Sequence, residues 1–305
     1  MVAPDDDPQS VVTRLAHEHL DPETARRWLR LVRPAVQLLS PVGGASYDDL
    51  PRVGRLGGLP DVPPGFVWPV WEGHGPLPLV AEVDLGAVRA AGLDPGLALP
   101  RRGRLLAFHY DGPFLQDPDG VVDVDDPGTR AASRLLHLDD DPAARVPADG
   151  PAGLHVYPER VLRGRGTVST PGWADVALVE ELGDPAAGDG LAAHRRWMSH
   201  PVNAEAFRAA LAAHLAPPDL SPDEVVHQLG GWAHHVQDPV EAEVAADPLR
   251  WRPVLQVGSE PRLGGPPAAR SDDEMSWDDL GALYWLARDD RLAELDEVRF
   301  TRQSG

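Results

Sequence analysis

One histidine and two glutamines could supply hydrogen bonds to a polar ligand. His227 and Gln228 stand just before the Gly230-Gly231 pair, and Gln256 lies in the apolar run that follows. Imidazole can also act as a general base. An alternative to ligand binding is therefore a small-molecule hydrolase that uses His227 with nearby carboxylates. A purely structural interpretation competes with both. In that interpretation His227 stabilises the C-terminus of a helix, and Gln256 satisfies loop backbone.

Histidines and carboxylates are numerous enough to raise the question of a metal site. Six of the 12 histidines fall between residues 194 and 235. Metal sites do use His and Asp, but these histidines show neither a His-x-Glu nor an HExxH spacing. The acidic clusters lack the alternating pattern and glycine of an EF-hand loop. The sequence therefore predicts no metal ion, no cofactor and no assignable catalytic residue.

Tryptophans form the third group of candidate binding residues. The chain has nine, of which Trp68 and Trp71 stand in a proline-rich stretch and Trp232 follows the second Gly-Gly pair. Exposed aromatic residues in loops favour a protein or ligand interface. The alternative is that these side chains cover the core beneath long loops.

The elements that must position these residues follow from capping signals and apolar periodicity. Two short helices are expected within residues 9–33, with Asp21 as the N-cap of the second. Residues 191–215 predict helix, and a capping box at Ser221 and Glu224 predicts a short helix that Gly230-Gly231 ends. Strands are expected at residues 35–39, 79–84, 104–110, 135–138, 176–180, 253–257, 282–287 and 298–301. Residues 40–78 and most of 111–150 are expected to be loop.

Three features recur in the same order with nearly constant spacing. Leu56-Gly57-Gly58 matches Leu229-Gly230-Gly231, with an offset of 173. The run at 80–83 matches 254–257, and the run at 103–106 matches 281–284. This pattern predicts two copies of one α+β unit packed about a pseudo-twofold axis, with a binding groove between the equivalent loops. Chance similarity among apolar strands is the alternative.

Composition excludes several classes of partner and site. The 305 residues carry a formal net charge of −20, every one of the 28 basic residues is arginine, and cysteine is absent. Nucleic acid and anionic membranes are therefore disfavoured as partners, because both are bound by clustered basic residues. Disulfides and thiolate metal sites are excluded. No apolar run approaches the length of a membrane span and the first ten residues are acidic, so a cytoplasmic location is expected.

Several of these segments together resemble the YwqG-like family of bacterial proteins of unknown function. The segments are Arg55–Pro60, Pro63–Phe66, Trp68-Pro69 and Pro76–Asp84, followed by His227–Gly231, Val254–Val257 and Trp277–Leu286. The resemblance implies a duplicated α+β fold and no catalytic residues. Glu82 stands where that family usually has glutamine, and Trp232 where a Tyr-Pro step commonly follows the glycine.

The sequence as a whole predicts a non-catalytic binding protein. We expect an α+β fold with two similar, mainly antiparallel units and added N-terminal helices. The expected divisions are a helical segment at 1–33, a first repeat at 34–150, a connecting segment at 151–220 and a second repeat at 221–305. A protein partner with a basic surface, or a small polar ligand, would bind in the groove between the repeats. The candidate binding residues are Gly57, Gly58, Trp68, Trp71, Glu82, His227, Gln228, Gly230, Gly231, Trp232 and Gln256.

Overall fold

A single antiparallel sheet of ten strands organises the chain. The computed structural model describes residues 7–40, 47–112, 115, 117, 120–123, 126–184, 191–217, 226–259, 275–277 and 281–305. Within these residues the strand order is β14-β13-β12-β11-β1-β10-β2-β6-β7-β8. The strands are β1 (Arg33–Leu39), β2 (Arg52–Leu56), β6 (Leu79–Asp84), β7 (Arg104–His109), β8 (Ser133–Leu138), β10 (Arg160–Ser169), β11 (His227–Gly230), β12 (Trp251–Gly258), β13 (Ala282–Arg288) and β14 (Val298–Gln303). The expectation of a mixed fold with a mainly antiparallel sheet is confirmed.

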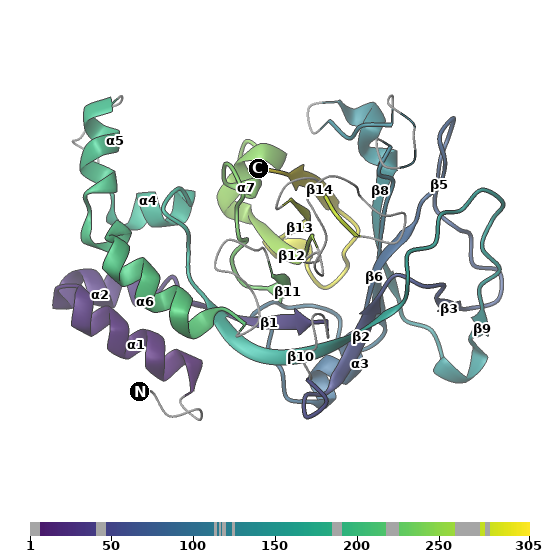
Figure 1. Ribbon diagram of the computed structural model, residues 1–305, viewed down its shortest axis with the longest axis horizontal. Helices are drawn as coiled ribbons and strands as arrows, with labels where there is room; N and C mark the ends of the chain where they lie inside the picture. Colours follow the sequence, from purple (N-terminus) through teal and green to yellow (C-terminus); the bar gives the residue numbers. More distant parts are fainter. Residues whose placement is uncertain are drawn as a thin grey trace, which may run out of the picture.

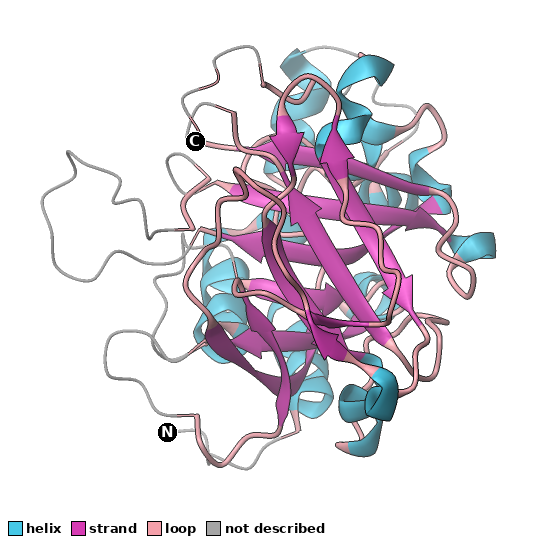
Figure 2. Ribbon diagram, turned by 90° about the vertical axis from the view of Figure 1, so that its right-hand side faces the viewer, coloured by secondary structure: helices cyan, strands magenta, loops and turns pink. Residues whose placement is uncertain are grey.

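The sheet curls until its two edge strands approach each other. Figure 1 shows β10 sweeping beneath β14, β13 and β12, and Figure 2 shows strands crossing in projection as one sheet folds over itself. Trp285 Nε1 on β13, next to the edge strand β14, donates to Ser133 Oγ on the other edge strand β8 at 2.8 Å, and β14 itself contacts β8. The largest apolar cluster draws residues from both halves of the chain. The sheet is therefore nearly closed around its own core.

Helices cover the outside of this sheet. The α-helices are α1 (Pro8–His19), α2 (Pro22–Leu29), α3 (Leu85–Ala90), α4 (Val176–Leu182), α5 (Leu191–Met198), α6 (Glu205–Leu215) and α7 (Val240–Val244). A second apolar cluster joins α1, α2, α4 and α6 to the end of β10, and α7 contributes to a third cluster over β12 and β13. In the described part of the chain, no helix combines the length and apolar character needed to cross a bilayer.

Short elements line the remaining connections. The two-residue strand β3 (Asp61–Val62) pairs with β9 (Val146–Pro147), and β4 (Val70–Trp71) pairs with β5 (Gly75–Pro76). The 3-10 segments are η1 (Pro127–Ala132), η2 (Pro142–Ala144), η4 (Pro201–Asn203), η5 (Pro248–Arg250) and η6 (Asp289–Arg291). The predicted loop at 40–78 is thus partly wrong, because it contains β2 of the main sheet.

The N-cap predicted at Asp21 is confirmed. Asp21 Oδ1 accepts hydrogen bonds from the backbone N–H groups of Glu23 and Thr24, each at 3.1 Å. Replacing Asp21 with alanine should lower the free energy of unfolding by about 1 kcal/mol, because two backbone donors lose their acceptor. Asp21→Asn retains an acceptor and should leave stability nearly unchanged. Urea denaturation of both variants checks this, and an equal loss in the two would contradict a capping role.

The strand predicted at 176–180 is wrong, because this segment forms helix α4. Leu178 and Leu182 are four residues apart and both are buried, while Val179 and Glu180 between them are exposed. That spacing is helical rather than alternating. The predicted strand ended at Glu180 and did not include Leu182, so the helical spacing of the two leucines was not recognised.

The strand β10 was not predicted, because arginine and glycine dominate its sequence. It nevertheless lies at the centre of the sheet, paired with β1 on one side and β2 on the other. A Cβ on Gly164 would stand 2.6 Å from Leu93 and 2.8 Å from Val53. The glycine therefore lets these side chains close over the strand.

The helix predicted to end at Gly230 is wrong over its last residues. Its start at Ser221 lies outside the described residues, but His227–Gly230 form strand β11. This strand pairs with β1 on one side and β12 on the other. Ladder hydrogen bonds to partners distant in sequence override the local helix signal.

Candidate functional site

The two Gly-Gly turns lie at opposite ends of the long strand β10. Gly58 N donates to Tyr157 O at 2.9 Å, just before β10 begins. Trp232 N, next to Gly231, donates to Ser169 Oγ at 2.7 Å, where β10 ends. Ten strand residues separate these points by roughly 30 Å. The structure therefore does not bring the two turns together around one groove.

Trp68 and Trp71 pack against the outer face of β7 and its neighbours. Trp68 Nε1 donates to Leu77 O at 2.9 Å, and its ring meets the edge of Phe108. Trp71 is buried and stacks on His74 with 3.7 Å between ring centroids. The placement of these two tryptophans matches the alternative in which they cover a core beneath loops.

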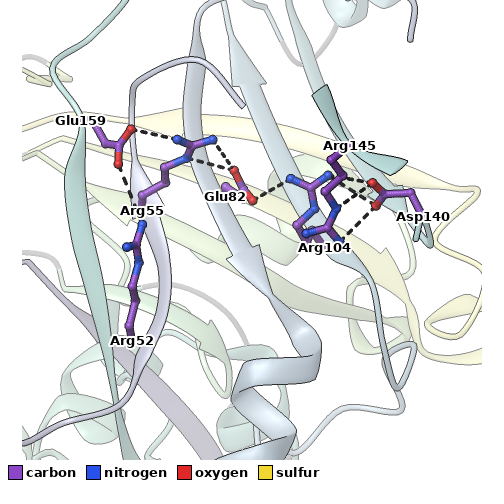
Figure 3. A network of polar contacts seen from close by, with 7 residues as sticks. All are labelled: Arg52, Arg55, Glu82, Arg104, Asp140, Arg145 and Glu159. Atoms are coloured by element: carbon purple, nitrogen blue, oxygen red, sulfur yellow. Dashed lines mark hydrogen bonds and ion pairs between the residues drawn. The ribbon is translucent and has the colours of Figure 1, made fainter. Parts of the chain in front are cut away.

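Glu82 belongs to a network of ion pairs on the first half of the sheet (Figure 3). One of its oxygens lies 2.8 Å from Arg55 Nη2 and the other lies 2.8 Å from Arg104 Nη1. Arg104 also pairs with Asp140, at 3.1 Å. Figure 3 shows Glu159, Arg52 and Arg145 completing the chain of contacts. Both Glu82 oxygens are therefore engaged by arginine.

His227, Gln228 and Gln256 lie together on neighbouring strands, with Gln228 opposite Gln256. Gln228 Nε2 donates to the carbonyls of Gly230 and Trp232. Gln256 Oε1 accepts from His234 N at 3.0 Å, so both glutamines satisfy loop backbone. Burial, followed by the charge of Arg160, lowers the pKa of His227 from 6.5 to about 4. The histidine is neutral at pH 7 and is not the helix cap that the structural interpretation expected.

Trp232 leads from this cluster to a pocket. Its Nε1 donates to Leu31 O at 2.6 Å, and the Arg33 guanidinium lies 3.2 Å from the centre of its ring. Arg33 and Trp232 line an open pocket of about 270 Å³, measured with its solvent-filled mouth. We call this the Arg33–Glu241 pocket. Its lining residues are Arg33, Asp175, Val176, Ala177, Trp232, Pro239, Glu241, Pro248, Leu249 and Trp251.

Elements distant in sequence build the Arg33–Glu241 pocket. Arg33 begins β1, Asp175 precedes α4, and Glu241 lies in the first turn of α7. The turn η5 contacts both α4 and α7, and Figure 1 shows these two helices on the same side of β12. The packing of η5 against both helices therefore holds the walls of the pocket together.

Glu241 is the least satisfied group in this pocket. The residue is 6% exposed, and neither carboxylate oxygen has a hydrogen-bond partner in another described residue. Burial, followed by the nearby Asp175 charge, raises the pKa of Glu241 from 4.5 to about 7. A buried carboxylate without a partner is costly, so its retention points to a ligand or to a proton.

Asp175 and His235 form a buried pair beside Glu241. His235 Nε2 lies 2.8 Å from Asp175 Oδ1, and Gly172 N donates to Asp175 Oδ2 at 2.6 Å. Burial favours the neutral ring, but the hydrogen bond and charge of Asp175 outweigh it and raise the pKa of His235. Val240 N–H points at Nδ1 from 3.3 Å, which favours the neutral tautomer that carries its proton on Nε2. A proton on both nitrogens would face the Val240 N–H, so in this arrangement the ring is neutral.

Arg33 does not compensate these carboxylates by direct contact. Its Nη1 has no partner in the described residues, and its guanidinium lies over Trp232. Burial, followed by the charge of Arg252, lowers the pKa of Arg33 from its ordinary value to about 9. Arg33 is therefore still positively charged at pH 7, and its charge attracts the carboxylates of Asp175 and Glu241 through space.

Sequence reasoning found only Trp232 among the residues of this pocket. His235 was counted among the clustered histidines, but Asp175 precedes it by 60 residues. Arg33 and Glu241 were not singled out. No local spacing joins positions 33, 175, 235 and 241, so a motif search cannot find them.

Comparison with models of protein families assigns most of the chain to one family. Residues 54–302 match the family described as "Domain of unknown function (DUF1963)". The matched range runs from β2 to β14 and contains most of the sheet. No curated protein matches the chain. The finer resemblance to the YwqG-like family stays a prediction.

Proposed function

Because this chain belongs to the DUF1963 family, whose description names no activity, we propose a function from the site alone. The protein is a binding protein whose ligand brings a positive charge into the Arg33–Glu241 pocket. Glu241 carries this proposal, since its buried carboxylate has no partner in another described residue. A bound cation would supply the missing partner.

The charge balance of the pocket supports a cationic ligand. Asp175 and Glu241 contribute two carboxylates, whereas Arg33 contributes one guanidinium whose face is occupied by Trp232. With His235 neutral, the pocket needs one more positive charge or a proton on Glu241. Burial strengthens the attraction of the carboxylates for such a ligand, because the effective dielectric constant is low there.

Binding describes this site better than acid–base catalysis by its histidine. Nε2 of His235 is engaged by Asp175, and Nδ1 receives the Val240 N–H. A general base needs a free nitrogen within reach of the substrate proton. In this arrangement His235 orients Asp175, and Glu241 is the group whose oxygens are left for a ligand.

The variant Glu241→Gln tests the proposal. In a thermal-shift assay, we expect wild-type protein to be stabilised by several degrees by at least one of methylammonium, Zn²⁺, Mn²⁺, Mg²⁺ and Ca²⁺. Glu241→Gln should lose that response, because the amide carries no charge. Its ligand-free melting temperature should rise, because an unpaired buried charge is removed. Glu180→Gln on the exposed face of α4 is the matched control and should respond as wild type does.

The outcome against this function is equally definite. If neither methylammonium nor any of the four ions stabilises the wild type, the pocket does not bind cations. If Glu180→Gln and Glu241→Gln respond alike, binding occurs elsewhere on the acidic surface.

We further infer that the acidic surface attracts a basic protein partner in the cytoplasm. A net charge of −20 supports this inference, because complementary charge accelerates association. Native mass spectrometry of protein purified from its own cells would identify the partner. Its association rate should fall as ionic strength rises, and a rate independent of salt would exclude charge steering.

The strand order supports our inference that the sheet arose by duplication. Outward from the central β10–β1 pair, it reads β2-β6-β7-β8 on one side and β11-β12-β13-β14 on the other. The strand register supports this too. Arg55 on β2 pairs with Glu82 on β6, and the equivalent residues Gln228 on β11 and Gln256 on β12 also pair with each other. The Arg33–Glu241 pocket adjoins the second unit alone, so the two copies would have diverged in function.

A further inference from the structure

We propose that Asp175, His235 and Glu241 bind one divalent transition-metal ion, of the Zn²⁺ or Mn²⁺ class. This inference rests on the proposed function and names its ligand. One ligand atom from each of the three side chains lies within 4.8 Å of the other two. Metal–ligand bonds of about 2.0–2.5 Å place two donors on one ion up to roughly 5 Å apart. The three atoms can therefore surround a single ion after small side-chain rotations.

Glu241 provides the second and independent observation. It is 6% exposed, lines the pocket, and has two oxygens without a partner in another described residue. If Glu241 served only to fill space in the core, nothing would compensate the free-energy cost of removing its carboxylate from water. Coordination to an ion compensates it at the place where the other two donors already lie.

The donor set favours a transition metal over Mg²⁺ or Ca²⁺. Two carboxylates and one imidazole offer a mixed oxygen and nitrogen set, whereas Mg²⁺ and Ca²⁺ prefer oxygen alone. Asp175 is already oriented by Gly172 N, at 2.6 Å from Oδ2, which leaves Oδ1 for the ion. Three protein donors leave a coordination position open, and Arg33 stands by the same pocket to attract an anionic group there.

His235 must change its proton arrangement when the ion binds. His235 Nε2 and Asp175 Oδ1 lie 2.8 Å apart, a distance that two neighbouring ligands of one metal ion also have. Without the ion, a proton on Nε2 lies between these two atoms. The ion replaces that proton, and the ring then carries its proton on Nδ1. The contact from Val240 N–H to Nδ1 is long, at 3.3 Å, and opens in this step.

The test uses the full-length protein, stripped with EDTA and titrated calorimetrically with Zn²⁺ and with Mn²⁺. We expect a stoichiometry of one ion for each chain. Glu241→Gln and His235→Gln should each weaken binding at least tenfold. The exposed residues Glu180 and His194 give the controls Glu180→Gln and His194→Gln, which should bind as wild type does. Visible absorption of the Co²⁺-loaded protein should change in His235→Gln, because a nitrogen ligand is lost.

Each contrary result has a distinct meaning. If methylammonium stabilises the wild type through Glu241 but neither metal binds, the metal inference is overturned and the cation-binding function stands. If no cation binds, both are overturned. If Zn²⁺ and Mn²⁺ bind equally well to Glu241→Gln and His235→Gln, the ions are held elsewhere and this site is wrong.

Discussion

Replacing His109 with phenylalanine is expected to remove about 2 kcal/mol of acid sensitivity between pH 7 and pH 5. His109 is 1% exposed inside the curled sheet, and neither ring nitrogen has a partner in the described residues. Burial, followed by the charge of Arg302, lowers its pKa from 6.5 to about 3. The unfolded chain therefore takes up a proton below pH 6.5 that the folded chain refuses. Stability from this group is complete above pH 6.5 and declines as the pH falls toward 3.

Phenylalanine suits this position because the histidine ring already packs as an aromatic group. It stacks on Phe300 with 4.9 Å between centroids and meets Trp277 edge to face. Urea denaturation at pH 7 and at pH 5 measures the effect as a difference between the two conditions. The exposed His17 on α1 provides the control variant His17→Gln, whose pH dependence should equal that of wild type. An equal loss on acidification in His109→Phe and wild type would show that the buried ring does not contribute.

Replacing Gly230 with alanine is expected to destabilise the protein by at least about 3 kcal/mol. Gly230 adopts φ +72°, a conformation that side-chain-bearing residues rarely adopt. A Cβ there would lie 1.9 Å from the Pro95 carbonyl oxygen and 2.8 Å from its carbon. Backbone of a proline cannot move aside as a flexible side chain can. The end of β11 would therefore separate from the loop that packs on it.

Gly65→Ala is the matched control for this substitution. Gly65 also has a positive φ, of +81°, but a Cβ there would meet nothing within 4 Å. The control isolates the backbone strain, which should cost about 1 kcal/mol. Urea denaturation of both variants measures the difference, which is the steric contribution of Pro95. Equal destabilisation in the two variants would contradict this close approach.

The glycine pairs show how a local sequence signal can be correct while its function remains open. Their repetition predicted two equivalent glycine loops, and Gly57, Gly58, Gly230 and Gly231 all have positive φ. Backbone conformation at a glycine is dictated locally, so the sequence was sufficient for that prediction. The position of each turn depends on the direction of its strand. Because β2 and β11 run antiparallel, their turns lie at opposite ends of the sheet.

Elements with strong local signals were predictable from the sequence alone. Asp21 and Pro22 specify the start of α2, and the apolar runs that form β6, β12 and β13 are each a strand long. Strand β10 and strand β11 carry no such signal. Their arginine, glycine and glutamine residues become strand because neighbouring strands on both sides bond to their backbone.

The sequence by itself determined the helices at the N-terminus, most strands of the sheet and the absence of thiol chemistry, because each depends on residue type and short-range periodicity. Only the tertiary structure decided the site. Arg33, Asp175 and Glu241 come from three separate segments that line one pocket, where α4 and α7 both contact η5, and His235 contacts Asp175 beside it. Burial then alters their chemistry, since desolvation and neighbouring charge act only when distant segments meet.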